Sequence, residues 1–156
     1  ILQGQTSTNI VEFKSNVETA VTISKADILH SSTLPRTHDT IKHYDNDAKI
    51  VKFKELNEIS WGDVDGMINI TDEIVEFMHS LQNYYDEPGF KKAECLKDVY
   101  VRLIKYLLLL NSDKYANTNI VACTHGIIIA ALMSMRDNKL FDINDKPQFE
   151  QSIRLI

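Results

Sequence analysis

Long hydrophobic runs, glycine and proline are all scarce in this sequence of 156 residues. The longest uninterrupted apolar runs, from Leu107 to Leu110 and from Ile127 to Met133, fall far short of the roughly 20 residues that a membrane-spanning helix needs. With only 5 glycines and 3 prolines, a collagen-like or low-complexity chain is also excluded. We therefore expect a soluble, cytoplasmic globular protein that does not associate with membranes.

Cysteine and positive charge are sparse as well. Cys95 and Cys123 do not have the spacing of metal ligands, and Cys123 lies inside an apolar stretch, so we expect two free thiols in a reducing compartment. The 17 basic residues are scattered and are outnumbered by 22 acidic ones, which gives a net charge of −5. This excludes the basic footprint of a nucleic-acid-binding protein, so an anionic ligand must be held by a local site.

Apolar periodicity divides the chain into alternating helical and strand-like segments. Segments with helical character cover residues 9–23, 35–44, 71–85, 96–110 and 126–135, and short buried segments with strand character cover 26–32, 48–56, 119–124 and 146–156. The helix over 71–85 is expected to have Thr71 as its N-cap. This alternation predicts an α/β layer on a mostly parallel sheet, within a single domain spanning 1–156.

His125 and Gly126 interrupt the most hydrophobic part of the chain, at the join between a predicted strand and a predicted helix. Ligands of α/β sheets bind where strands end and helices begin. Gly126 would let a ligand approach the backbone, and the N-terminus of the following helix favours an anion such as phosphate. The alternative is a structural histidine that caps a buried element.

Three further charged residues lie beside predicted strand ends or helix starts. Arg36 follows a strand and a Ser-rich turn, where a guanidinium can bind phosphate oxygens with two donors. Glu58 follows the next strand, and a sheltered carboxyl group there could protonate a leaving oxygen. Glu94 precedes a long helix whose dipole it would complement. An exposed arginine and an exposed glutamate remain the alternatives for Arg36 and Glu58.

Five segments in this order resemble the motifs of one family. The segments are LQGQTST, similar to an LQG loop followed by an acid; SSTLPRTHDT, similar to S-x-L-x-R-x-x-x-T; LNEISWGDVDGM, similar to L-x-E-x-x-x-G-x-x-x-G; AECLKDVYVRL, similar to G-E-S-x-x-D-x-x-x-R; and VACTHG, similar to a terminal strand with an HG pair. Together they resemble the histidine phosphatase superfamily, the phosphoglycerate mutase-like proteins.

The resemblance implies a three-layer α/β/α sandwich and phosphoryl transfer through a phosphohistidine, without a metal or another cofactor. Three positions match catalytic residues: Arg36 would bind the phosphate, Glu58 would protonate the leaving oxygen, and His125 would be the second histidine of the site. Gln3, Thr124 and Gly126 would bind substrate. The implied partner is a small phosphorylated metabolite, handled by a phosphatase or a phosphomutase, and a homodimer is left open.

The family's nucleophilic histidine belongs to an R-H-G motif upstream of the LQG loop, and that motif does not occur in this sequence, which starts at Ile1. Among the other histidines, His30 is predicted at a strand end, His38 and His43 on one helix, and His79 on another. We expect a chain that lacks its first strand. The alternative is a degenerate relative that binds phosphate, or serves as an interaction module, without turnover.

Two other phosphatase chemistries fit the sequence less well. A cysteine phosphatase needs an arginine six residues after its thiolate, but Ile129 and Val101 occupy those positions. A metal phosphohydrolase could use His38 and Asp39, yet adjacent residues of a helix are expected to point to different sides.

Overall fold

Three parallel strands form the sheet of the computed structural model, which describes residues 16–146. The strands are β1 (Ile28–Ser32), β2 (Ile50–Phe53) and β3 (Ile120–Cys123), in the order β2-β1-β3. In the central strand, Ser31 is paired with Lys52 of β2 and with Cys123 of β3. Because all strands run the same way, their carboxyl ends meet at one edge of the sheet.

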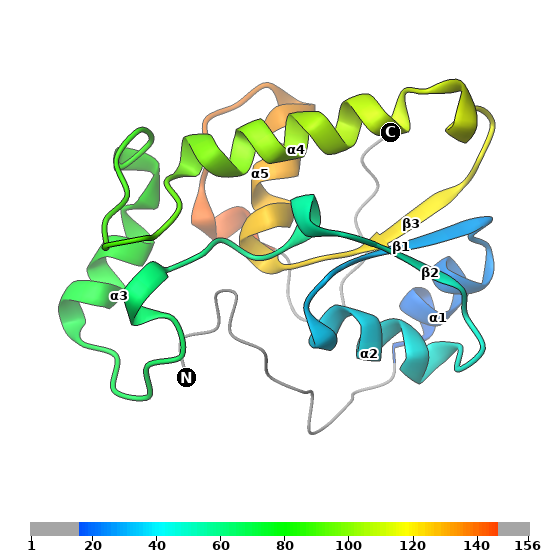
Figure 1. Cartoon of the computed structure of the whole chain (residues 1–156), viewed down its shortest axis with the longest axis horizontal. Helices are drawn as coiled ribbons and strands as arrows, with labels where there is room; N and C mark the ends of the chain where they lie inside the picture. The colour runs from blue at the N-terminus through cyan, green and yellow to red at the C-terminus, as the bar shows by residue number, and fades with distance from the viewer. Residues whose placement is uncertain (1–15, 147–156) are drawn as a thin grey trace.

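Helices cover both faces of this sheet (Figure 1). They are α1 (Val17–Ser24), α2 (Pro35–Tyr44), α3 (Asp72–His79), α4 (Leu96–Leu110) and α5 (Gly126–Asp137). Figure 1 shows α1 and α2 on one face and α4 and α5 on the other, with α3 beyond the carboxyl edge of the strands. This is the predicted three-layer α/β/α sandwich.

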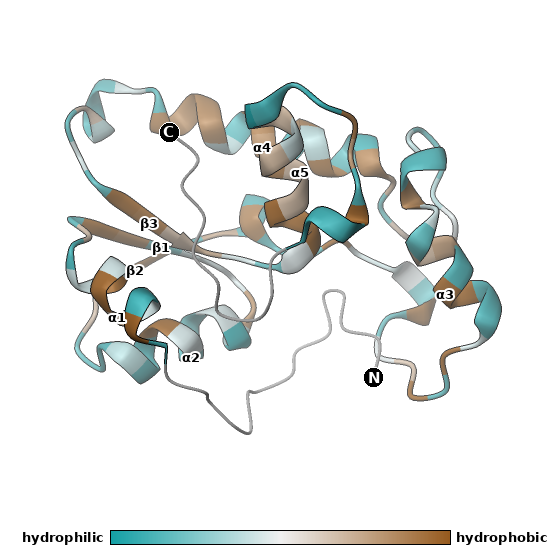
Figure 2. Ribbon diagram, turned by 180° about the vertical axis from the view of Figure 1, so that it is seen from behind, coloured by the Kyte–Doolittle hydropathy of each residue, from teal (hydrophilic) through white to brown (hydrophobic). Residues whose placement is uncertain are grey.

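The alternating side chains of β1 divide the interior between the two layers. Leu29 packs with Ile23, Ile41 and Ala48 on the side of α1 and α2. His30 lies on the opposite side, where its ring contacts Tyr106 of α4. Figure 2 shows that β3 is largely hydrophobic, whereas α2 is largely pale or hydrophilic, as expected for a buried strand and a surface helix.

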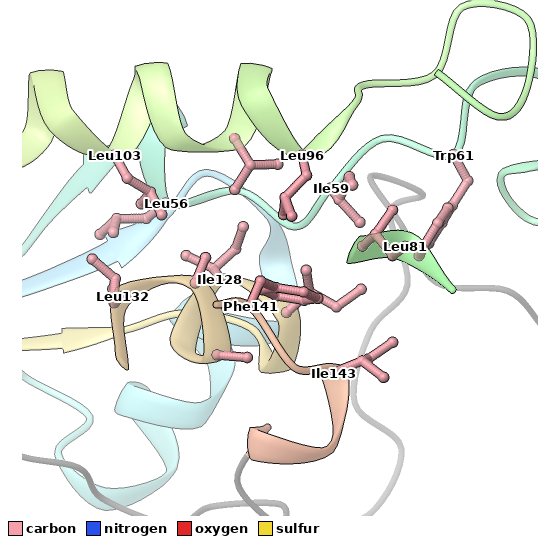
Figure 3. Packing of buried hydrophobic residues seen from close by; sticks show 14 of the residues in the cluster. Leu56, Ile59, Trp61, Leu81, Leu96, Leu103, Ile128, Leu132, Phe141 and Ile143 are labelled. Atoms are coloured by element: carbon pink, nitrogen blue, oxygen red, sulfur yellow. The ribbon is translucent and has the colours of Figure 1, made fainter. Parts of the chain in front are cut away.

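The larger core lies between α4, α5 and the segment that follows β2. Leu96 and Leu103 of α4 point toward Leu56 and toward Ile128 of α5 (Figure 3). All four side chains are buried, in agreement with the apolar stripe that predicts α4 as a core-facing helix. This packing fixes the segment after β2 against the start of α5.

Some predicted boundaries are wrong. The predicted helix over 71–85 is interrupted at Ser80, because the Ser80 hydroxyl donates to the carbonyl oxygens of Glu76 and Phe77 at the end of α3. Thr71 occupies the N-cap position but makes no side-chain capping bond. The end of the predicted strand over 48–56 is a 3₁₀ turn, Lys54–Leu56. Residues 9–15 and nearly all of the predicted last strand lie outside the described residues.

Both cysteines are free thiols, as expected; Cys95 is buried and Cys123 is half-buried. Within residues 16–146, no helix combines the length and the apolar character needed to cross a bilayer.

Candidate functional site

Arg36 and His125 meet at the carboxyl edge of the sheet. Arg36 follows β1 and is the second residue of α2, whose start is set by Pro35 at the first helical position. His125 follows β3 and is the N-cap residue of α5. The Nε atom of Arg36 donates to Nδ1 of His125 over 3.2 Å. Two residues that are 89 positions apart are thereby in direct contact.

The carboxyl group of Glu58 lies at the same helix N-terminus. It accepts hydrogen bonds from the backbone N–H of Ile59, over 3.0 Å, and from that of Ile127, the second residue of α5. Its charge also interacts with that of Arg36. Glu58 is only 8% exposed, so this carboxyl group is sheltered as the sequence predicts. The structure therefore brings Arg36, Glu58 and His125 together.

Burial sets the protonation of this group. It raises the pKa of Glu58 to about 7, although backbone hydrogen bonds and the charge of Arg36 oppose the shift. It lowers the pKa of His125 to about 3, assisted by the charges of Arg36 and Arg102. Burial also lowers the pKa of Arg36, while Glu58 and Asp65 raise it. Near neutral pH the site thus contains a carboxyl group that can hold a proton and a neutral imidazole.

The residues predicted to bind substrate are placed differently. The Thr124 hydroxyl donates to the carbonyl oxygen of Leu56 over 2.6 Å, which ties the end of β3 to the segment after β2. Gly126 is the first residue of α5, and a Cβ there would meet only side-chain carbons of Lys146, at 3.6 Å or more. The protein itself does not require glycine at this position. Gln3 lies outside the described residues.

Glu94 precedes the N-cap of α4, as the sequence indicates, and its carboxylate is bound by Arg102. Two parallel hydrogen bonds, of 2.9 and 3.1 Å, join the guanidinium to the carboxylate. Arg102 also donates to the carbonyl oxygens of Glu55, over 2.6 Å, and Glu58, over 3.3 Å. The Glu94 carboxylate accepts from the N–H of Ser60 over 2.9 Å. This Glu94–Arg102 clamp holds the backbone on both sides of Glu58.

Sequence reasoning assigned no role to four other polar residues at this edge. The Ser32 hydroxyl lies 2.9 Å from Nε2 of His125 and 2.8 Å from the Thr37 hydroxyl. The amide oxygen of Asn57 accepts from both the N–H and the hydroxyl of Thr33, each over 2.8 Å. Ser32 and Asn57 lie within two of the segments that resemble the family motifs, and this position is the sequence feature that could have indicated them.

His30 is not at the end of its strand, as predicted, but in the middle of β1 and fully buried. Its Nδ1 lies 2.9 Å from the Tyr106 hydroxyl, and its Nε2 has no hydrogen-bond partner among the described residues. Burial, followed by the charge of Lys114, lowers its pKa to about 4.

The side chains of His38 and Asp39 approach to 3.4 Å, contrary to the expectation that they diverge. Within residues 16–146, no three His, Cys, Asp or Glu side chains are grouped as a metal site would need.

A polar hollow of about 300 Å³ borders the clamp; it is lined by Lys54, Glu55, Asn57, Glu94, Arg102 and Lys105. Its lining includes none of Arg36, Glu58 and His125. The hollow therefore does not mark the group formed by those three residues.

The arrangement can stabilise an anion and supply a proton. Arg36 and the N-terminus of α5 favour a phosphoryl group, and Glu58 can protonate an oxygen beside it. Both ring nitrogens of His125 are hydrogen-bonded, to Arg36 and to Ser32. His125 therefore does not present a free nitrogen for attack on phosphorus.

The sequence of residues 5–143 matches the model of the histidine phosphatase superfamily, branch 1. A comparison with curated protein sequences returns no match.

Several solved structures are similar to this chain. YhfR of Bacillus stearothermophilus superposes with a TM-score of 0.69 at 18% identity, covering 94% of this chain and 76% of that one. The alpha-ribazole phosphatase from Shigella flexneri gives 0.59 at 18% identity, with coverage of 87% and 73%. Phosphoglycerate mutase from Bacillus anthracis str. Sterne gives 0.60 at 19% identity, with coverage of 87% and 72%. At these identities the likeness shows the shared fold.

Proposed function

Because the chain belongs to the histidine phosphatase superfamily, branch 1, we propose that it acts in phosphoryl transfer through a phosphohistidine, as a phosphatase of a small phosphorylated metabolite. One observation carries the proposal. Arg36, His125 and the buried carboxyl group of Glu58 share the N-terminus of α5, where an anion is stabilised and a proton is available. No metal or cofactor is part of the proposed chemistry.

In the proposed reaction an imidazole nitrogen attacks phosphorus, the bond from phosphorus to the leaving oxygen breaks, and Glu58 gives its proton to that oxygen. Water then attacks phosphorus, its proton returns to the Glu58 carboxylate, and the phosphorus–nitrogen bond breaks. Arg36 binds the phosphoryl oxygens throughout, with His125 beside them. The nucleophilic histidine of the family's R-H-G motif is not among these 156 residues; among them, Arg36, Glu58 and His125 are the anion-binding and proton-donating groups of the proposed reaction.

Between the two reactions, we propose hydrolysis of the phosphohistidine and not mutase action. The chain between Gly66 and Glu94 is short and contains α3 and one 3₁₀ turn, so it offers little cover with which to exclude water from a phosphohistidine. The similar structures include a phosphatase and a mutase, which are compatible with either outcome.

The test compares an alkyl phosphate with p-nitrophenyl phosphate. In a protein that includes the R-H-G histidine, Glu58→Gln should reduce turnover of the alkyl phosphate by about 100-fold or more and affect the aryl phosphate far less, because only the alkoxide needs a proton to leave. His125→Ala should reduce turnover of both by about 100-fold. Glu55→Gln and the exposed His79→Ala are the matched controls. Equal losses on both substrates would remove Glu58 from the acid role.

A second candidate is a phosphate-binding module of the same fold without turnover. It is favoured by the engagement of both ring nitrogens of His125, together with the missing R-H-G motif. Titration with inorganic phosphate and an assay for acid-labile phosphoprotein separate the candidates. Phosphate binding that depends on Arg36 and His125, with neither turnover nor acid-labile phosphoprotein, would establish the module and refute the phosphatase.

A further inference from the structure

A continuous chain of hydrogen bonds passes through His125. Arg36 Nε lies 3.2 Å from Nδ1 of the ring, and Nε2 lies 2.9 Å from the Ser32 hydroxyl. That hydroxyl lies 2.8 Å from the hydroxyl of Thr37, which lies 3.0 Å from the carbonyl oxygen of Leu34. The chain therefore joins the start of α2 to the N-cap of α5 through the last residue of β1.

The two ends of this chain have opposite and fixed hydrogen-bonding character. A guanidinium has only donors, so Nδ1 of His125 must accept from Arg36. A carbonyl oxygen can only accept, so Thr37 donates its hydroxyl hydrogen to Leu34, or to the more distant carbonyl of Ser32 at 3.5 Å. In either case the Thr37 oxygen is left as an acceptor.

The donor and acceptor roles of Ser32, in the middle of this series of hydrogen bonds, follow from the two ends. Ser32 already accepts from the N–H of Leu34 over 3.1 Å, and it donates its own hydrogen to the Thr37 oxygen. The remaining lone pair of Ser32 accepts from Nε2 of His125. In this arrangement Arg36 donates to His125, His125 to Ser32, Ser32 to Thr37, and Thr37 to the backbone carbonyl. The proton of the neutral imidazole therefore lies on Nε2.

Because these residues are buried, reversing the direction of the hydrogen bonds would cost free energy. Ser32 is fully buried, Thr37 is 3% exposed and His125 is 7% exposed, so water cannot replace a missing partner. The opposite tautomer would place the Nδ1 hydrogen against the Nε hydrogen of Arg36. It would also force the Ser32 hydrogen away from Thr37. Each change leaves a buried donor without an acceptor.

We propose that Ser32 and Thr37 are positioning residues that hold His125 in the Nε2-protonated tautomer, so that Nδ1 is the ring nitrogen facing Arg36. The consequence for phosphate rests on the proposed function, because it assumes that the phosphoryl group binds between Arg36 and His125. The tautomer itself does not depend on that assumption. Thr37 contacts Ser32, and Ser32 contacts the His125 ring, so Thr37 affects the ring only through Ser32. The test makes use of this indirect contact.

Thr37→Val removes the hydroxyl and keeps the shape of the side chain. The Ser32 hydrogen then loses its acceptor and turns toward Nε2 of His125, which favours the Nδ1-protonated form. Long-range ¹H–¹⁵N spectra of the full chain with labelled histidine distinguish the two tautomers. We expect the Nδ1-protonated fraction to rise by about tenfold, the equivalent of one misdirected hydrogen bond. Thr37→Ser retains a hydroxyl and should keep the native spectrum.

A double substitution tests whether the effect passes through Ser32. In a Ser32→Ala background, Thr37→Val should change the His125 signals no further. An unchanged His125 tautomer in a folded Thr37→Val protein would overturn the proposal, as would the same change in Thr37→Ser. If Thr37→Val does not fold, Thr37→Ala removes the same hydroxyl and carries the same expectation.

Titration of these variants with inorganic phosphate separates this proposal from the proposed function. A shifted tautomer with a changed phosphate affinity supports both. A shifted tautomer with native phosphate affinity supports the positioning role of Ser32 and Thr37, and it removes His125 from contact with phosphate.

Discussion

Replacement of Arg102 by alanine should be among the most destabilising single changes outside the apolar core. The guanidinium makes four hydrogen bonds, two to Glu94 and one each to the carbonyl oxygens of Glu55 and Glu58. Its side chain is 14% exposed and that of Glu94 is 21% exposed, so the pair is mostly shielded from water. Loss of one partner leaves a carboxylate in this setting without its counter-charge.

The expected loss in the free energy of unfolding follows from the burial of this ion pair. Breaking a buried ion pair by removing one partner costs about 3–5 kcal/mol, and the remaining exposure of both groups places Arg102→Ala near the lower end, at about 3 kcal/mol. For a chain of this length, that loss corresponds to a melting temperature lower by about 6–12 °C. Arg102→Lys keeps the charge but cannot reach the carboxylate and both carbonyls together, so it should recover only part of the loss.

Urea unfolding measures these losses directly. Arg136→Ala is the matched control, because Arg136 also pairs with an adjacent carboxylate, that of Asp137, but at the exposed end of α5. Its loss should be much smaller than that of Arg102→Ala. A double-mutant cycle of Arg102→Ala with Glu94→Gln should give a coupling of about 1.5–3 kcal/mol. A loss under about 0.5 kcal/mol for Arg102→Ala would refute the argument that the clamp holds the Glu58 segment.

Two further predictions concern stability. Gly62 has φ +62°, and a Cβ there would collide with the carbonyl oxygen of Lys91 and lie 2.5 Å from the N of Ala93, so Gly62→Ala should lose about 2–4 kcal/mol in urea unfolding. Gly126→Ala, whose Cβ meets only flexible carbons at 3.6 Å or more, should be neutral or slightly stabilising, and similar losses for the two variants would contradict this reasoning. His30 has its pKa lowered from 6.5 to about 4, so below pH 6.5 the unfolded chain binds a proton that the buried ring does not, and the free energy of unfolding falls between pH 6.5 and about 4. His30→Phe should flatten that decline when unfolding at about pH 7 is compared with about pH 5, and an unchanged slope would exclude His30 as its source.

The sequence predicts the described strands and most of the helices because their periodicity reflects burial on one or both faces. It also indicates Arg36, Glu58 and His125, since each follows a strand and the carboxyl ends of parallel strands meet at one edge. That argument needs only the order of elements, and the contact between Arg36 and His125 is in agreement with it.

The residues that sequence reasoning missed depend on contacts between distant segments. Arg102 reaches the carbonyls of Glu55 and Glu58 across 47 and 44 positions; the sequence marks it only as the final arginine of the pattern similar to G-E-S-x-x-D-x-x-x-R, and these contacts do not follow from that pattern. His30 was misplaced because its strand extends two residues beyond it, and a polar ring in the middle of a buried strand runs against the usual preference. Its burial depends on Tyr106, which α4 supplies.

The alternation of side chains along β1 links ligand affinity to thermal stability. Leu29 faces the layer of α1 and α2, His30 faces Tyr106, and Ser32 ends the strand beside His125. A slip of this strand by one position would exchange the two faces, burying an imidazole among aliphatic side chains and moving the serine away from the histidine. Substitutions that loosen the register of β1 are therefore expected to impair ligand affinity and thermal resistance together, even when they lie far from any bound anion.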